Sequence, residues 1–208
     1  MKLAEMTVTQ FADVLASDAP APGGGSTAAL AGALGAALTA MVCELSVNKK
    51  QFAEIREDLL AVQAKASDLQ NRFLDVMDRD TDAFLVVSNA FAMPKATDEE
   101  KAARSAAIQK GLEGCTATPF EMMQLAAETI RLTESLLGRF NTASASDLGV
   151  GALSLRTAVQ GAWLNVLINI GSLKNKELAE SYRAKGQALV DEVVAAADRV
   201  YEIVLTLV

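Results

Sequence analysis

Histidine is absent from this chain of 208 residues, and its absence narrows the chemistry that the protein can carry out. Histidine is the commonest general base and metal ligand, and it activates the nucleophile of Ser-His and Cys-His sites. Any acid–base chemistry must therefore use Asp, Glu, Lys or Tyr side chains whose pKa values are shifted by burial or by neighbouring groups.

Cysteine is scarce as well. Cys43 and Cys115 are far apart in the sequence and match neither a Cys-x-x-Cys motif nor the spacing of zinc ligands. We therefore expect free thiols and no metal site. The N-terminal residues lack the apolar core of a signal peptide, which favours a cytoplasmic protein.

Positive charge is outnumbered, because 19 Lys and Arg residues stand against 26 Asp and Glu residues and give a net charge of −7. Nucleic-acid-binding proteins concentrate positive charge on one surface, and no basic run is present here, so we expect no nucleic-acid partner. Hydrophobic residues make up 51% of the chain and charged residues 22%, a composition that excludes intrinsic disorder.

Strand signals are also missing, whereas helix signals are frequent. The chain has four prolines, abundant alanine and no β-branched clusters between turn residues. Capping boxes begin at Thr7, Thr97 and Thr118, and the last has Pro119 in the first helical position. The sequence predicts a single all-α domain over residues 1–208, with helices near 8–17, 26–48, 51–92, 98–113, 119–138, 144–172 and 176–206.

The long segment 51–92 has two apolar positions in each heptad repeat. Every member of these two sets is apolar except Asp80; the sets are Leu59, Ala66, Phe73, Asp80 and Val87, and Ile55, Val62, Leu69, Val76, Ala83 and Ala90. The C-terminal segment 176–206 has a similar apolar repeat. We therefore expect these two helices to pack as a long antiparallel, coiled-coil-like pair that the other helices cover.

Residues 19–43 carry no charge, which raises the question of a membrane span. The helical part is rich in Ala and Gly rather than in Leu, Ile and Phe, and these small residues contribute little to membrane insertion. We therefore expect no membrane association. Small side chains let helix backbones approach closely, so this helix should pack at short range inside the subunit or across a dimer interface, through Ala28, Gly32, Gly35 and Ala36.

A glycine-rich turn leads into the same helix. Gly23, Gly24, Gly25 and Ser26 follow Pro22, and their backbone N–H groups lie at a helix N-terminus that could bind an anionic or carbonyl-bearing ligand. The alternative is a sharp turn that needs glycine for its backbone conformation and for close helix packing. The sequence alone leaves both interpretations open.

Three polar features interrupt apolar helices. Asp80 lies in the heptad repeat, where a carboxylate is costly unless it sets the register or serves a function. Asn165 and Asn169 are four residues apart on one face of an uncharged helix, where their amides either join helices or line a pocket for a flat heterocycle. Asp147, after Ser146, falls in the first turn of that helix, where simple capping explains a carboxylate.

Together these segments resemble the cyclodeaminase/cyclohydrolase family of folate enzymes, which includes the cyclodeaminase domain of formiminotransferase-cyclodeaminase and stand-alone bacterial methenyltetrahydrofolate cyclohydrolases. The resemblance covers nearly the whole chain and rests on segments in the same order: 21–26 with 31–38, 48–52, 80–84, 93–101, Ser146 with Asp147, and Asn165 with Asn169. It implies an all-helical subunit, an obligate homodimer and a tetrahydrofolate derivative as the substrate.

The resemblance implies two reactions. In a cyclodeaminase, N10 of 5-formiminotetrahydrofolate attacks the formimino carbon and ammonia leaves, which gives 5,10-methenyltetrahydrofolate. In a cyclohydrolase, a base activates water against the methenyl carbon to form 10-formyltetrahydrofolate. The first reaction is our leading prediction and the second is the alternative. A third interpretation is a non-catalytic helical dimer that binds folate or a partner helix.

The resemblance also implies roles for particular residues. Asp80 or Asp147 is expected to act as the base and to stabilise positive charge, because a carboxylate can serve either reaction. The other expected residues contact the substrate: the backbone of Gly23, Gly24 and Gly25, the side chain of Ser26, Lys49 and Lys95 at the glutamate tail, and Ser146, Asn165 and Asn169 around the ring system.

Overall fold

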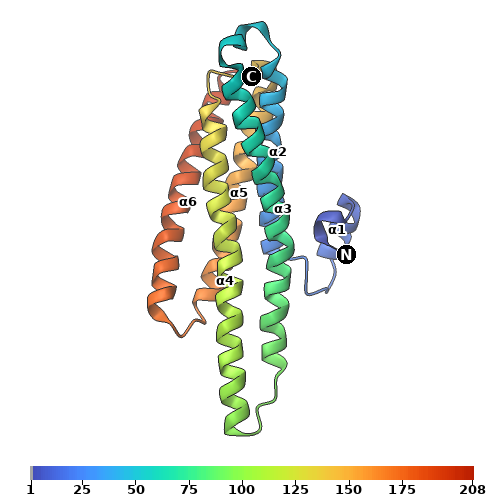
Figure 1. Cartoon of the computed structure of the whole chain (residues 1–208), viewed down its shortest axis with the longest axis vertical. Coiled ribbons are helices and arrows are strands. Elements are labelled where there is room, and N and C mark those ends of the chain that lie inside the picture. The colour runs from blue at the N-terminus through green and yellow to red at the C-terminus, as the bar shows by residue number, and fades with distance from the viewer. Residues whose placement is uncertain (1) are drawn as a thin grey trace.

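The computed structural model describes residues 2–208, and every regular element within that range is helical (Figure 1). The six α-helices are α1 (Val8–Leu15), α2 (Gly24–Val47), α3 (Arg56–Ala92), α4 (Asp98–Ser135), α5 (Ala145–Ile170) and α6 (Lys176–Leu205). Three short 3₁₀ helices are η1 (Leu3–Glu5), η2 (Lys50–Ile55) and η3 (Thr142–Ser144). The all-α prediction is confirmed.

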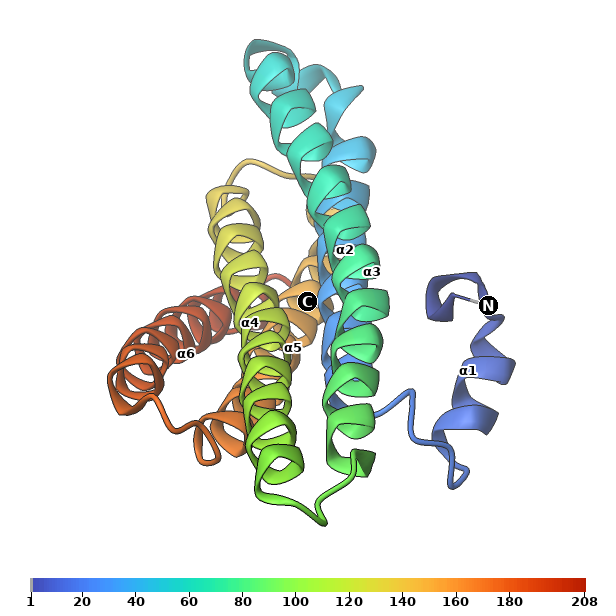
Figure 2. The ribbon, with the colours of Figure 1, turned by 60° about the horizontal axis from the view of Figure 1, so that its bottom comes forward.

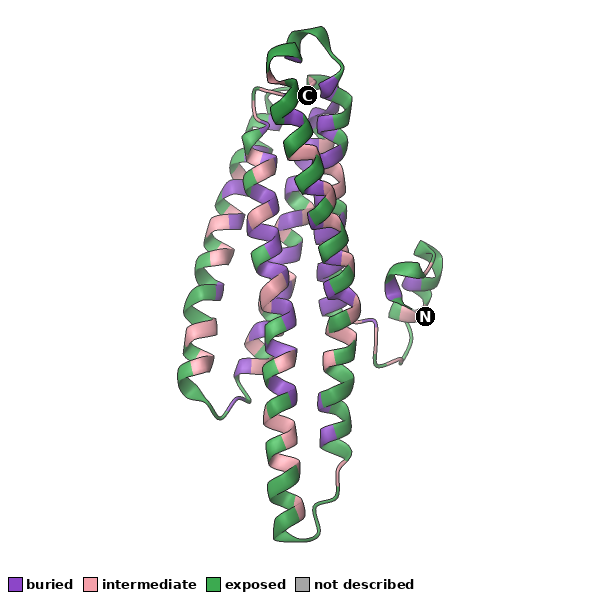
Figure 3. Cartoon of the chain, viewed as in Figure 1, coloured by how far each residue is buried: buried purple, intermediate pink, exposed green. Residues whose placement is uncertain are grey.

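Helices α2, α3, α4 and α5 form an elongated bundle, with α6 packed against α5 and α4 (Figures 1 and 2). Buried residues line the sides of the bundle helices that face one another (Figure 3). The short helix α1 stands beside α3, and the segment before it is attached there by the Leu3 N–H, which donates to Oδ1 of Asp78 at 2.7 Å. The bundle is therefore the part of the molecule that can position a site.

The expected pairing of the segment 51–92 with the C-terminal helix is wrong. Helix α3 packs against α2, which precedes it, and against α4, which follows it after a short loop, whereas α6 packs against α5 and α4. A short connection costs little loop-closure entropy and favours neighbours in the sequence as neighbours in space. The heptad positions of α3, such as Leu59, Leu69 and Phe73, are buried as expected, but against α2 and α4.

The expected break between two helices near residues 114–118 is also wrong, because α4 continues from Asp98 to Ser135 with Pro119 inside it. Capping boxes are present at Thr7 and Thr97, where each hydroxyl accepts a hydrogen bond from the third helical N–H. Thr118 caps no helix. Its surroundings explain why the helix continues, and they belong to the site described below.

Small residues bring α2 close to its neighbours, as predicted. A Cβ atom on Gly32 would overlap the ring of Phe73, and one on Gly35 would lie 2.7 Å from Cγ of Leu155. By length and composition α2 could span a membrane, but half of its most apolar window is buried inside the fold. Another glycine sets the contact between α6 and α5, where a Cβ on Gly186 would lie 2.8 Å from Cε3 of Trp163.

Candidate functional site

Two adjoining pockets lie where the N-terminus of α2 meets α3 and α5. The smaller has a cavity volume of about 190 Å³ and is lined by Pro20, Ala21, Gly23, Gly24, Gly25, Ser26, Asp80, Thr81, Phe84 and Asn165. The larger, of about 380 Å³, reaches α4 and is lined by Asp80, Phe84, Val87, Phe91, Leu112, Cys115, Asn165, Ile168, Asn169 and Ser172. Asp80, Phe84 and Asn165 are common to both, so the pockets form one candidate site.

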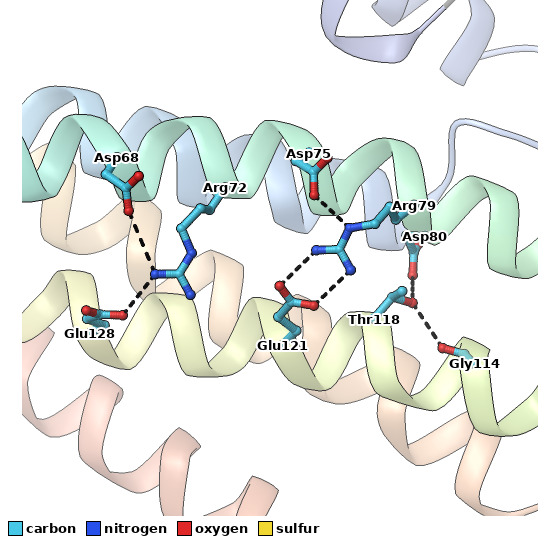
Figure 4. A network of polar contacts seen from close by, with 9 residues as sticks. All are labelled: Asp68, Arg72, Asp75, Arg79, Asp80, Gly114, Thr118, Glu121 and Glu128. Carbon is cyan, nitrogen blue, oxygen red and sulfur yellow. Dashed lines mark hydrogen bonds and ion pairs between the residues drawn. The ribbon is translucent and has the colours of Figure 1, made fainter.

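Asp80 is held between two helices. Its Oδ1 accepts a hydrogen bond of 2.8 Å from the Thr118 hydroxyl of α4 (Figure 4). Its other side rests on the first turn of α2, where a Cβ on Gly25 would overlap Oδ2 and lie 3.2 Å from Cγ. Only glycine leaves room for the carboxylate at the positive end of the α2 dipole. The close approach explains part of the glycine-rich turn.

Burial raises the pKa of the Asp80 carboxyl above its ordinary value, and the hydrogen bond from Thr118 opposes part of that rise. The carboxylate is consequently a stronger base than one in water. The neighbouring Arg79 does not neutralise it, because its guanidinium is bound by Asp75 at 2.7 Å and by both carboxylate oxygens of Glu121 at 2.8 and 2.9 Å (Figure 4).

The two asparagines of α5 are both fixed by backbone carbonyl groups. Nδ2 of Asn165 donates to the Gly161 carbonyl at 2.9 Å, and Nδ2 of Asn169 donates to the Cys115 carbonyl of α4 at 2.6 Å. The predicted sharing of one helix face is confirmed, because both side chains line the larger pocket. The alternative role as a link between helices also applies to Asn169, which joins α5 to α4.

The glycine-rich turn contributes shape and backbone groups. Ser26 is buried, and its hydroxyl accepts a long hydrogen bond of 3.4 Å from the Gly23 N–H. Thr81 adds a buried hydroxyl to the same pocket, and this oxygen has no hydrogen-bond partner among residues 2–208. A buried hydroxyl without a hydrogen-bond partner is unfavourable, so a ligand atom that forms a hydrogen bond with it is stabilised there.

Sequence reasoning missed the apolar part of the site. Phe84 and Phe91 line the larger pocket and are 42% and 54% exposed, which is unusual for large aromatic side chains. Their signal was present, since Asp80, Phe84, Val87 and Phe91 follow the helical spacing of one face of α3. Thr118 and Cys115 were also missed, because their contribution depends on how α4 packs.

The remaining predicted residues lie elsewhere in the chain. Ser146 and Asp147 begin α5, 18 residues before Asn165, which is about 27 Å along the helix. Lys49 follows the far end of α2, beside Lys50 and Arg56, and Lys95 lies in the exposed loop between α3 and α4. Within the chain, Gly23–Ser26, Asp80, Asn165 and Asn169 therefore lie together, whereas Asp147 lies far from Asp80.

No group of three or more Cys, Asp or Glu side chains within residues 2–208 is arranged to hold a metal ion. Both cysteines are free and buried. Burial raises the pKa of each thiol to about 11, so neither is an activated nucleophile.

Comparison with known proteins gives a consistent result. A family profile described as formiminotransferase-cyclodeaminase matches residues 7–188. The chain is 40% identical over 198 residues to a methenyltetrahydrofolate cyclohydrolase of Methylorubrum extorquens, with 95% of each chain covered. It is 30% identical over 190 residues to a rat formimidoyltransferase-cyclodeaminase, and the match spans 91% of this chain but 35% of that longer protein.

A solved structure shares the fold. The formiminotetrahydrofolate cyclodeaminase of Thermotoga maritima superimposes with a TM-score of 0.79 at 23% sequence identity, covering 98% of this chain and 96% of the other. The profile match alone extends over most of the sequence, and the resemblance predicted from the motifs is confirmed. The chain belongs to the formiminotransferase-cyclodeaminase family.

Proposed function

We propose that this protein acts on the carbon that bridges N5 and N10 of tetrahydrofolate, with Asp80 as the base. The observation that carries this proposal is a partly buried carboxylate with a raised pKa, in a pocket with two phenylalanines and two fixed amides. The aromatic faces suit a flat ring system, and negative charge beside the reacting carbon stabilises its positive charge.

Cyclodeamination uses one proton shuttle. N10 attacks the carbon of the formimino group, whose nitrogen is protonated, and Asp80 removes the N10 proton as the new C–N10 bond forms. Asp80 then returns that proton to the formimino nitrogen. The bond between the carbon and this nitrogen breaks, and ammonia leaves the 5,10-methenyl cation. The family profile and the names of several relatives support this reaction.

Cyclohydrolysis is a second candidate at the same carbon. Asp80 removes a proton from water as the oxygen adds to the methenyl carbon, and it delivers that proton to N5 as the C–N5 bond breaks. The new hydroxyl group releases its own proton to solvent as the carbonyl forms, which gives 10-formyltetrahydrofolate and one free proton. The observation that favours it is the 40% identity to a cyclohydrolase over nearly the full length of both chains.

One absorbance experiment separates the two. The near-ultraviolet band of the methenyl chromophore is followed after the protein is added to each folate, and runs without protein correct for spontaneous hydrolysis. A faster rise from 5-formiminotetrahydrofolate with release of ammonia supports the cyclodeaminase. A faster decay of 5,10-methenyltetrahydrofolate alone supports the cyclohydrolase. If neither rate changes, the protein is a binding module instead.

We also propose that the active protein is a homodimer formed through the outer face of α2 and α5. This face carries a row of exposed apolar side chains: Leu34, Met41 and Leu45 on α2, and Val150, Leu153, Leu164 and Ile168 on α5. A row of this kind is typical of an interface between subunits. Leu164 and Ile168 are 67% and 74% exposed, and Ile168 is part of the larger pocket.

A two-fold axis across the middle of this face would complete the site. Asp147 and Asn165 are 18 residues apart, which is five full helical turns, so both point in the same direction from α5. In an antiparallel pairing of two α5 helices, Asp147 of the partner subunit comes beside Asn165. The same operation brings the Lys49 end of α2 toward the site, where its cations can bind the anionic glutamate tail. Lys95 is the alternative contact for that tail, on the α3–α4 loop of the same subunit.

The buried, reduced cysteines fit a cytoplasmic protein.

Mixing two inactive variants tests the shared site. Asp80→Asn and Asp147→Asn proteins are each expected to be inactive, whereas dimers reassorted from both contain one intact site. Because half of randomly assorted dimers are mixed and each has one of two sites intact, activity should recover to about a quarter of the wild-type value. Absence of recovery after confirmed subunit exchange would exclude the shared site.

Leu164→Glu should give monomers in sedimentation analysis.

A further inference from the structure

The proline inside α4 leaves one backbone carbonyl without its helical donor. In an α-helix each N–H bonds to the carbonyl four residues earlier, and proline has no N–H. Pro119 therefore cannot serve the Cys115 carbonyl, although α4 continues through both residues. Cys115 is one of the residues that line the larger pocket.

Asn169 supplies the missing donor from another helix. Its Nδ2 donates to the Cys115 carbonyl oxygen at 2.6 Å. With any residue other than proline at position 119, the backbone N–H of that residue would donate to this oxygen instead. A carbonyl only accepts hydrogen bonds, so the amide of Asn169 must direct Nδ2 toward α4. Its Oδ1 is thereby turned away from α4 and is available to a ligand in the pocket that the residue lines.

Asn165 is oriented in the same way, because its Nδ2 donates to the Gly161 carbonyl at 2.9 Å and its Oδ1 is the free acceptor. The two amide oxygens and the Asp80 carboxylate are all acceptors, and no Lys or Arg of residues 2–208 lines either pocket. The polar side chains on the inner wall therefore favour a ligand that presents N–H donors or positive charge.

We propose that Pro119 is a positioning residue that fixes Asn169 as a hydrogen-bond acceptor for an N–H group on the ring system of the ligand. This inference rests on the proposed function, because a reduced pterin ring is a fused nitrogen heterocycle with N–H donors along its edge. Pro119 touches no ligand; it acts by leaving the Cys115 carbonyl for Asn169.

A merely structural role makes a different prediction. If Asn169 only compensates for the lost helical bond, Pro119→Ala restores that bond and leaves ligand binding unchanged. If Pro119 positions Asn169, the same variant gives a helix at least as stable as wild type and weaker binding. Stability and affinity then change in opposite directions, which a general loss of folding cannot produce.

The experiment measures binding of tetrahydrofolate by calorimetry and thermal unfolding of wild type, Pro119→Ala, Asn169→Ala and the double variant. Pro94→Ala, in the exposed α3–α4 loop, is the matched proline control. We expect Pro119→Ala to weaken binding by at least about tenfold with no loss of thermal stability, and the Asn169→Ala effect to be smaller in the Pro119→Ala background. NMR of the Asn169 side-chain amide gives a readout without ligand, since its protons should lose their protection in Pro119→Ala.

The outcomes are distinct. Pro119→Ala protein that binds tetrahydrofolate as tightly as wild type overturns this inference and leaves the proposed function intact. Wild-type protein that does not bind tetrahydrofolate overturns the proposed function, and with it the ligand assigned to Asn169. Equal protection of the Asn169 amide in both proteins would exclude the role of Pro119 by itself.

Discussion

At the scale of single residues, Asp80 illustrates a conflict between stability and function. Burial makes its ionised form unfavourable, yet the hydroxyl of Thr118 donates a hydrogen bond to the carboxylate, and the first turn of α2 lies against it. Because the folded-state pKa is raised above the unfolded value, folding is favoured by this group below the unfolded pKa, and that contribution is lost as pH rises through the folded pKa. At neutral pH the carboxylate is a cost to the fold.

Asp80→Asn should therefore lose activity without losing stability. We expect turnover to fall at least about a hundredfold, because the amide cannot accept the substrate proton. Thermal unfolding at pH 7 should occur at the same or a higher temperature than in wild type, and the difference should shrink as pH falls from the raised folded pKa to about 4, the unfolded value. Turnover close to wild type would remove Asp80 from the mechanism.

Thr118→Val should change the pH dependence of activity. The hydroxyl stabilises the carboxylate of Asp80, so its removal raises the pKa of that carboxyl further. Since the base must be ionised, the acid limb of the kcat/KM profile should move to higher pH. Thr129→Val is a matched control, because Thr129 is buried on the same helix and donates to its own helix at Leu125. An unmoved acid limb in Thr118→Val would contradict this assignment.

At the scale of helices, much of the fold could be predicted from the sequence. The two capping boxes and the apolar repeats located most helices, and the small residues of α2 indicated its close packing. The pairing of helices could not be predicted, because an apolar repeat defines a buried face and not its partner. Thr118 with Pro119 is a valid local start signal that tertiary structure overrides, since Asn169 provides the hydrogen bond that proline removes.

The candidate site was predictable in part for the same reason. Asp80 and the two asparagines could be recognised because burying a polar group in an apolar helix costs free energy unless the group has a partner or a function. Phe84 and Phe91 did not, because aromatic residues at helical spacing usually belong to the core. Contacts between helices, such as Thr118 with Asp80, became visible only when α3 and α4 were placed side by side.

The start of α2 gives a prediction at this scale. Gly25→Ala would place a methyl group against the Asp80 carboxylate, which must move or force α2 away. We expect kcat/KM to fall at least about tenfold while the helical circular dichroism spectrum is unchanged. Gly114→Ala is the control, because a Cβ there meets only Ala83 at 4.0 Å and alanine favours the helix. Equal activities in the two variants would argue against a tight carboxylate seat.

At the scale of the whole molecule, the outer face of α2 and α5 is apolar, whereas the side formed by α4 and α6 is charged. The side formed by α4 and α6 carries exposed ion pairs, such as Arg131 with Glu192 at 2.5 Å and Arg199 with Glu134 at 2.6 Å, which contribute little to stability in water. The docking of α6 depends instead on close packing, above all where Gly186 meets Trp163.

Gly186→Ala should loosen α6 selectively. The added methyl group would overlap the indole ring, and such overpacking typically costs about 1–3 kcal/mol. The free energy of unfolding should fall by that amount in urea titrations, whereas binding of tetrahydrofolate to the remote pockets should be nearly unchanged. A loss of binding equal to that of Gly25→Ala would show that the position of α6 controls the site.

The contact between Gly186 and Trp163 also has a spectroscopic consequence. Trp163 is the only tryptophan of the sequence, and it lies at the junction of α5 and α6 rather than in the pockets. Excitation of this single indole therefore reports on one helix junction in every native-state titration, without an attached dye. Its emission and the near-ultraviolet band of a bound methenyl folate are separate signals, so one sample can show whether the junction loosens while the reaction proceeds.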